Sequence, residues 1–158
     1  MLFVKSFPAV QGDDMALIDG GVQTGARFTS LILAEIAAAA SPEQMEGFFL
    51  SVGGRLAASY PIGEVRDLET VTQHINLVWH AFNWGQVRFE VDDEGIDIFH
   101  ADMPGSLEGD AQSLWPKAAP MILVGAYDGW FRQAGSGDRF HTAIRHYGDT
   151  LVELRHGI

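Results

Sequence analysis

The pattern of hydrophobic positions is most regular in the middle of the chain, where its period changes from that of a helix to that of a strand. Upstream, hydrophobic residues recur every three or four positions and predict one face of a helix: Leu68, Val71, Ile75, Val78 and Phe82. Downstream, hydrophobic and polar residues alternate as in a half-buried strand, at Val87, Phe89 and Val91. A tight turn at Asp92-Asp93-Glu94-Gly95 precedes a second alternating segment, so the pattern predicts a β-hairpin.

The tripeptide Asn83-Trp84-Gly85 separates this helix from the hairpin. Many helices end in a residue with a positive φ angle, which glycine and asparagine tolerate, so Gly85 and Asn83 predict a helix stop. Trp84 then lies between the helix and the sheet, where we expect its ring to fill the seam. The whole stretch predicts a helix docked onto its own hairpin.

The N-terminal half predicts two more helices. The first runs from about residue 28 to residue 40. The second starts at Ser41, a good N-cap that is followed by Pro42 and by Gln44 at the reciprocal position of a capping box. Asp67 is the expected cap of the helix at 68–82, so the second and third helices are expected to form an antiparallel pair joined by a short loop.

The C-terminal half predicts a fourth helix, which begins near Pro116 or Pro120 and ends at about Gln133. Gly125 and Gly129 are four residues apart within it and therefore lie on one face. A face without side chains allows another backbone to approach closely, so we expect a tight helix contact there.

The last residues predict a second hairpin, with strands at about 139–147 and 150–156 around a Gly148-Asp149 turn of type II′. The predicted order is ααα-ββ-α-ββ, an α+β fold in which N-terminal helices pack on antiparallel hairpins. Residues 1–25 show no durable period and are expected to be an irregular segment. Residues 26–158 are expected to form a single domain.

Composition and charge narrow the class of protein. A chain of 158 residues that is 47% hydrophobic has enough core for one domain. Its net charge of −11 argues against nucleic acid or an anionic membrane surface as a partner, whereas a neutral polysaccharide would not be repelled. The absence of cysteine excludes disulfides and thiolate metal sites. No stretch approaches the ~20 hydrophobic residues of a membrane span.

Few residues indicate reaction or metal chemistry. The second hairpin is able to bring His141, His146 and His156 together, which would allow a zinc site. However, no two histidines have the spacing of zinc ligands on a helix. The carboxylates of the turn at 92–94 are expected to be solvated rather than to act as acid–base catalysts. We find no catalytic constellation in the sequence and expect neither a cofactor nor a resident metal.

Several less common motifs lie between the end of the third predicted helix and the end of the fourth. They are Asn83-Trp84-Gly85, then His100 with Asp102 and Pro104, then Trp115, and finally Gly125 with Tyr127 and Trp130. In these motifs, and over roughly residues 28–135, the chain resembles the family of D subunits of bacterial cellulose synthases. The resemblance implies a non-enzymatic α+β subunit without a cofactor, whose dimers assemble into an eight-subunit hollow ring that helps β-1,4-glucan chains to be extruded in order. The implied partners are further copies of the chain, the cellulose synthase complex with its accessory proteins, and the glucan, but not nucleic acid.

Two parts of the chain are expected to carry this role. The helix at 68–82 is expected to supply a seam between subunits through three side chains, Leu68, Val71 and Val78. The resemblance places the N-terminal segment near the glucan, although the first 25 residues depart from the family's usual start. There, Phe3 and Phe7 are candidates to stack on sugar rings and Lys5 is a candidate donor to glucan hydroxyls.

Localisation and two alternative functions follow from the same reading. Since the N-terminal residues do not have the pattern of a signal peptide, we expect a cytoplasmic protein associated with the cellulose synthase of the inner membrane, with the periplasm as the alternative. The competing function is a small-ligand or metal-binding sensory domain with a pocket between hairpins and helices. A weaker alternative is a hydrolase that uses carboxylates such as those of Asp92 and Glu94.

Overall fold

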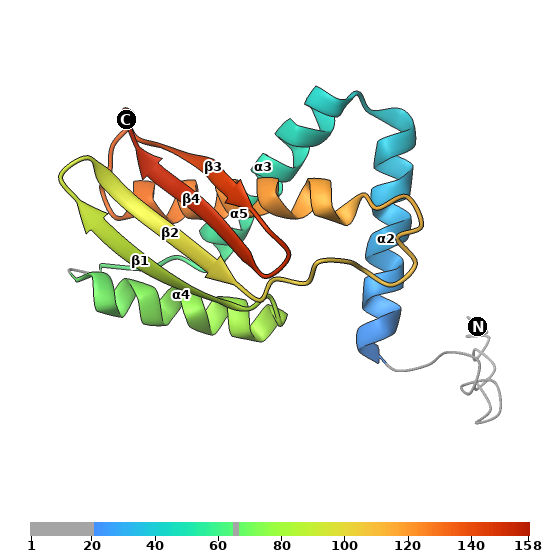
Figure 1. Ribbon diagram of the computed structural model, residues 1–158, viewed down its shortest axis with the longest axis horizontal. Helices are drawn as coiled ribbons and strands as arrows, with labels where there is room; N and C mark the ends of the chain where they lie inside the picture. Colours follow the sequence, from blue (N-terminus) through green and yellow to red (C-terminus); the bar gives the residue numbers. More distant parts are fainter. Residues whose placement is uncertain (1–20, 65–66) are drawn as a thin grey trace, which may run out of the picture.

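The computed structural model describes residues 21–64 and 67–158. One antiparallel four-stranded sheet, with the strand order β1-β2-β4-β3, forms the centre of the fold. The elements are α2 (Gly21–Ala39), α3 (Pro42–Ser59), α4 (Leu68–Phe82), β1 (Gln86–Asp92), β2 (Gly95–Ala101), α5 (Trp115–Gln133), β3 (His141–Tyr147) and β4 (Leu151–Gly157). The predicted α+β class and the order ααα-ββ-α-ββ are confirmed. In Figure 1, α5 lies behind the sheet, α4 runs along β1, and α2 stands at the far end away from the sheet.

The predicted helix caps are present. The Ser41 hydroxyl accepts a hydrogen bond from the Gln44 N–H, and the Gln44 side chain accepts one from the Ser41 N–H, which completes the capping box. Asp67 likewise accepts from the Thr70 N–H at the start of α4. The first helix differs from its prediction, because α2 begins at Gly21 rather than near residue 28 and includes residues that we assigned to an irregular segment.

The stop after α4 follows the prediction. Asn83 has φ 55° and Gly85 has φ 79°, both in the left-handed region. A Cβ atom on Gly85 would lie 1.9 Å from the Ala101 carbonyl oxygen, so only glycine fits this approach of the chain to the end of β2. The helix is indeed docked on its own hairpin: the Asn76 amide donates to the Val87 carbonyl at 2.9 Å and accepts from the Val87 N–H at 2.7 Å.

The helix pairing differs from the prediction. The expected antiparallel pair of α3 and α4 is wrong, since α3 packs mainly along α5. The contact depends on glycine in both helices: a Cβ on Gly53 would lie 2.1 Å from the Ile122 carbonyl oxygen, and one on Gly125 would lie 2.0 Å from that of Leu50. The bare face of α5 therefore does receive another backbone, as its glycine spacing predicted.

Both predicted hairpins are present in the sheet, but the predicted turn of the second hairpin is wrong. β1 pairs with β2 from Gln86 opposite Ala101 to Asp92 opposite Gly95. In the second hairpin Gly148 does not have positive φ, and three residues separate β3 from β4, so the type II′ assignment is wrong. The register of β3 and β4 also shifts between Ile144 and His146, as at a β-bulge.

The hydrophobic core comprises two adjoining clusters. The larger cluster fills the space between the sheet and the helices α4 and α5, and the smaller one lies between α2, α3 and the start of α5. Val71 and Val78 belong to the larger cluster, and each is 6% exposed. The prediction that these two side chains form a seam between subunits is therefore wrong, because they face the subunit's own sheet; Leu68 alone of the three predicted residues reaches the surface.

Candidate functional site

The family-like motifs converge on a buried hydrogen-bond network rather than on an open site. His100 is fully buried between β2 and α5. Its Nδ1 lies 2.6 Å from the Tyr127 hydroxyl and its Nε2 lies 2.6 Å from the Trp84 carbonyl oxygen. The Trp79 indole N–H donates to the same Tyr127 hydroxyl at 3.0 Å. Three motif residues and one tryptophan of α4 are thus joined in a single chain of contacts.

The chemistry of these atoms fixes the protonation of His100. A carbonyl oxygen only accepts, so Nε2 carries the proton and donates to Trp84, and Nδ1 accepts from the Tyr127 O–H. Burial lowers the pKa of His100 to about 4, against smaller opposing effects of the Trp84 carbonyl and of Asp102. Burial also raises the pKa of Tyr127. Both groups are therefore neutral at pH 7 and hold the core together rather than offering a proton to a ligand.

The remaining motif residues are also placed by packing and hydrogen bonds. The Trp130 indole N–H donates to the Tyr60 carbonyl, and that of Trp115 donates to the Pro104 carbonyl at 2.6 Å. Trp84 is half-buried, stacks on Trp79 with ring centroids 5.8 Å apart, and contacts both core clusters. The expectation that Trp84 fills a seam matches its position, which joins the two clusters.

Removing the hydroxyl of Tyr127 tests this network. In Tyr127→Phe, the Trp79 N–H and the His100 Nδ1 both lose their partner inside the core, so we expect the free energy of unfolding to fall by about 2 kcal/mol. Urea unfolding measures the change. Tyr60→Phe is the control, because its ring is 44% exposed, and we expect a change within about 0.5 kcal/mol. Equal stability of both variants would show that the network contributes nothing.

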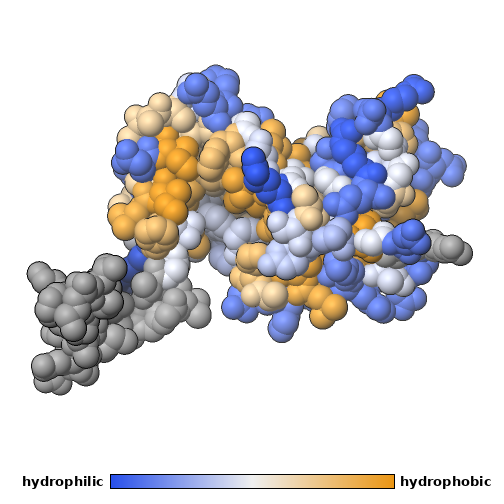
Figure 2. All heavy atoms as spheres, turned by 180° about the vertical axis from the view of Figure 1, so that it is seen from behind, coloured by the Kyte–Doolittle hydropathy of each residue, from blue (hydrophilic) through white to orange (hydrophobic). Residues whose placement is uncertain are grey.

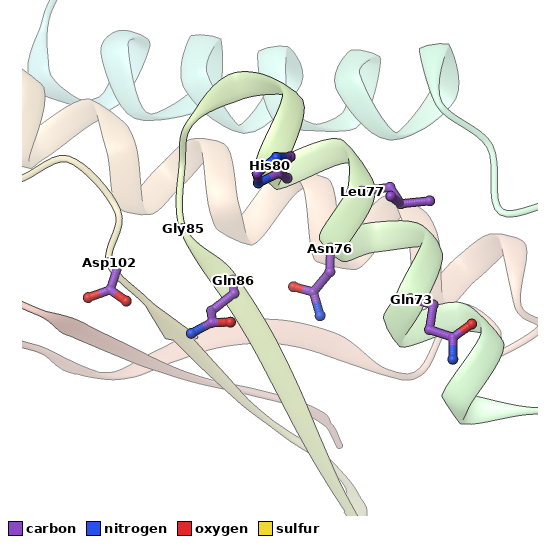
Figure 3. Close-up of a pocket in the computed structure, with 7 residues that line it drawn as sticks. All are labelled: Gln73, Asn76, Leu77, His80, Gly85, Gln86 and Asp102. Atoms are coloured by element: carbon purple, nitrogen blue, oxygen red, sulfur yellow. The ribbon is translucent and has the colours of Figure 1, made fainter.

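An open trough on the surface lies next to the motif residues, between α4 and the start of β1. Its volume is about 700 Å³, and seven residues line it: Gln73, Asn76, Leu77, His80, Gly85, Gln86 and Asp102. Figure 3 shows the side chains of Gln73, Asn76, Gln86 and Asp102 in a row, with Leu77 and His80 above them on α4. No pattern in the sequence predicted this site, since polar residues on a helix are normally only its solvated face.

A second surface feature is the hydrophobic outer face of α2. Phe28 is 64% exposed, Leu31 is 68% exposed and Ile32 is 45% exposed, while Leu33 on the opposite side is buried against the body. Figure 2 shows hydrophobic residues gathered over this arm of the molecule and a hollow between it and the body. The 3.6-residue pattern at 28–36 predicted a helix correctly, but the face it marked points away from the core.

Polar contacts tie α2 to the loop before α5. The Ser30 hydroxyl, which is buried, lies 2.9 Å from the Glu108 carbonyl oxygen, and Arg27 Nε donates to the Glu108 carboxylate at 2.9 Å. The helix is thus fixed on one side, whereas its other side exposes Phe28, Leu31 and Ile32. Large exposed hydrophobic faces of this kind mark interaction surfaces in proteins generally.

The three histidines proposed for zinc do not come together. His156 is buried, with Nδ1 2.8 Å from the Thr142 hydroxyl, whereas His141 is exposed beside Arg132. His146 is also exposed and faces Glu153 across the hairpin. Within residues 21–64 and 67–158, no group of three potential ligands has the geometry of a metal site. The metal-binding alternative therefore gains no support from the described part of the chain.

The turn carboxylates have a structural partner. Asp92 accepts hydrogen bonds from the backbone of Glu94 and Gly95 and pairs with Arg155 of β4 at 2.6 Å. The hydrogen bond from Arg155 is the main reason why the pKa of Asp92 falls to about 2. The same arginine also pairs with Asp97. These contacts close the hairpin, and the hydrolase alternative gains no support from them.

The N-terminal glucan-contact candidates, Phe3, Lys5 and Phe7, lie outside the described residues. No helix in the described part of the chain is both long and hydrophobic enough to cross a membrane.

A family model for the D subunit of cellulose synthase matches residues 22–157. The chain belongs to this family. The match begins at the start of α2 and ends in β4, so it includes the trough, the buried network and the exposed face of α2. A comparison with curated proteins finds no similar sequence.

Membership of the family of cellulose synthase D subunits assigns the chain an accessory role in cellulose synthesis and association with a cellulose synthase complex. It also gives the motifs a physical meaning. Asn83, Gly85, His100, Tyr127 and Trp130 position the backbone and the core, whereas the trough and the outer face of α2 are surfaces that a partner can reach. For this protein, function is therefore expected in surfaces presented to other molecules.

Proposed function

We propose that this chain is a non-catalytic scaffold subunit of a bacterial cellulose synthase complex. Copies of the subunit assemble into a hollow octamer, a tetramer of dimers, through which β-1,4-glucan chains pass and are kept in order for export and crystallisation. The assembly lies in the cytoplasm beside the inner-membrane synthase. Lys5, Phe3 and Phe7 remain its predicted glucan contacts in the N-terminal segment.

The observation that carries this proposal is the uncovered hydrophobic face of α2. Phe28, Leu31 and Ile32 expose more than two fifths of their surface each, on a helix whose other side is fixed to the body. Water contact with such a face is unfavourable by about 25 cal/mol for each Å² of apolar surface, so self-association that covers it is stabilising. Closed assemblies bury the same patch in every copy.

A charge placed in this face tests the assembly. We expect the wild-type protein to sediment as a large particle at micromolar concentration and Leu31→Glu to shift it to smaller species, while circular dichroism stays unchanged because this side chain is outside the core. Val91→Glu is the control, since Val91 is 60% exposed at the opposite end of the molecule on β1. The readouts are sedimentation velocity and cellulose output after complementation of a deletion strain.

Two results would contradict the proposal. One is a wild-type protein that is monomeric at micromolar concentration. The other is a Leu31→Glu protein that keeps the wild-type mass and restores cellulose fully.

A further inference from the structure

The trough between α4 and β1 has rigid walls. Asn76 reaches across its floor and holds both backbone groups of Val87, which fixes α4 to β1. At one end, Gly85 lies against the Ala101 carbonyl, so the strand start cannot move outward without losing the close packing. The site is thus formed by backbone and side-chain contacts within one subunit, without a partner chain.

Asp102 is held at the end of this trough in an uncommon backbone conformation. Its φ angle is 61°, and its N–H donates to the Thr150 carbonyl at 3.0 Å. A non-glycine residue in the left-handed region has a conformational cost, and such residues cluster where a side chain must be aimed at a ligand. Figure 3 shows the Asp102 side chain at one end of the row, next to Gln86.

Several lining groups remain available to a ligand. Within residues 25–64 and 67–158, the side chains of His80, Gln86 and Asp102 have no hydrogen-bond partner, and Gln73 has only a long contact with Glu69 at 3.4 Å. Asn76 is occupied by Val87 and serves as structure. Leu77, which is 69% exposed, adds a hydrophobic surface beside these polar groups.

The chemistry of the lining selects the class of ligand. No lysine or arginine lines the trough, and one of its lining residues is an aspartate, so an anion would be repelled. A single carboxylate with one imidazole does not make a metal site, and no three-ligand group occurs in the described chain. Amides that both donate and accept, together with a carboxylate acceptor and a hydrophobic side chain, match the hydroxyl groups and C–H faces of neutral sugars.

We propose that this trough binds a segment of a neutral, hydroxyl-rich saccharide chain along the Gln73–Asp102 row. The identity of the chain rests on the proposed function, which makes β-1,4-glucan the saccharide at hand. The residues that line the trough are different from Phe3, Lys5 and Phe7, the predicted contacts of the N-terminal segment. Each subunit therefore contributes a glucan contact of its own.

Calorimetric titration of the full-length protein with cellohexaose tests the inference. We expect wild-type protein to bind cellohexaose. The double variant Gln73→Ala/Gln86→Ala is expected to raise the dissociation constant at least about tenfold, because it lacks two amides that form hydrogen bonds with the sugar hydroxyls. Both residues are exposed, so folding is unaffected. Glu90→Ala is the matched control, since Glu90 is exposed on the same strand but outside the trough. Its binding is expected to equal that of wild type.

Oligogalacturonate of the same length tests the charge argument. It is expected to bind wild-type protein at least about tenfold more weakly than cellohexaose does. Asp102→Asn is expected to reduce this difference in affinity between the two oligosaccharides, because it removes the carboxylate. Asparagine also tolerates the positive φ angle at this position. The inference is overturned if the double variant binds cellohexaose as wild type does, or if oligogalacturonate binds equally well.

Failure of this inference differs from failure of the proposed function. A protein that assembles and restores cellulose in a deletion strain but does not bind cellohexaose overturns the saccharide site alone. A protein that binds cellohexaose in the trough but neither assembles nor changes cellulose output overturns the scaffold role alone.

Discussion

Gly53→Ala is expected to lower the free energy of unfolding by about 3 kcal/mol, whereas Gly54→Ala is expected to raise it by about 0.5 kcal/mol. The two glycines are neighbours on α3, and both substitutions remove the same helix penalty. They differ in what the new methyl group meets. On Gly53 it would lie 2.1 Å from the Ile122 carbonyl oxygen and 2.7 Å from the Ala126 nitrogen, and on Gly54 it meets nothing within 4 Å.

The size of the Gly53 effect follows from what has to move. The atoms in the way belong to the backbone of α5, which cannot rotate aside as a side chain does. The two helices must separate, and the core between them loses contacts. Urea unfolding of both variants at one protein concentration measures the difference. If Gly53→Ala is as stable as Gly54→Ala, the close contact of α3 and α5 does not exist in solution.

Acid is expected to remove about 3 kcal/mol of stability through His100 alone. The pKa of His100 is about 4 in the folded protein, below the ordinary value of 6.5 that applies to the unfolded chain. Above pH 6.5 both states are neutral and the stability is fully present. As the pH falls from 6.5 to 4, the unfolded chain takes up a proton that the folded core excludes, so the stability is lost across that window. About 2 kcal/mol of the loss is expected between pH 7 and pH 5.

Burial also lowers the pKa of His156, which adds to the loss of stability in acid. The contribution of His100 must therefore be measured from the titration of the His100 imidazole itself. Titration of the imidazole signals by NMR in the folded protein gives its pKa directly. The ring nitrogen shifts should also show the proton on Nε2, as donation to the Trp84 carbonyl requires. A His100 that titrates near pH 6.5, or that carries its proton on Nδ1, contradicts the network.

The sequence predicted the elements whose cause is local. The capping box at Ser41, the left-handed stop at Asn83 and Gly85, and the tight turn at residues 92–95 all depend on a few neighbouring residues, and all are confirmed. The pairing of α3 with α5 was missed because it depends on two glycines, Gly53 and Gly125, that are far apart in the chain.

The sequence identified the hydrophobic faces of the helices more readily than it predicted which of these faces are buried. The stripes of α2 and α4 have the same period, yet Val71 and Val78 are buried whereas Phe28 and Leu31 are exposed. Periodicity defines a face but not its partner, and the partner of α4 is the sheet that follows it. The trough was missed for a related reason, because its glutamines become a site only when β1 brings Gln86 beside α4.

Hydrogen bonds from the helices to the two edges of the sheet have a consequence for the assembly proposed above. The sheet ends in β1 and β3, and an uncovered edge strand invites the strand of another chain to continue it. Asn76 occupies the outward groups of Val87 on β1, and Asp128 accepts from the Thr142 N–H on β3. These contacts oppose open-ended addition of strands from other chains, which would lead to aggregation. In the proposed assembly, copies would then meet through α2 and form a closed particle with a fixed number of subunits.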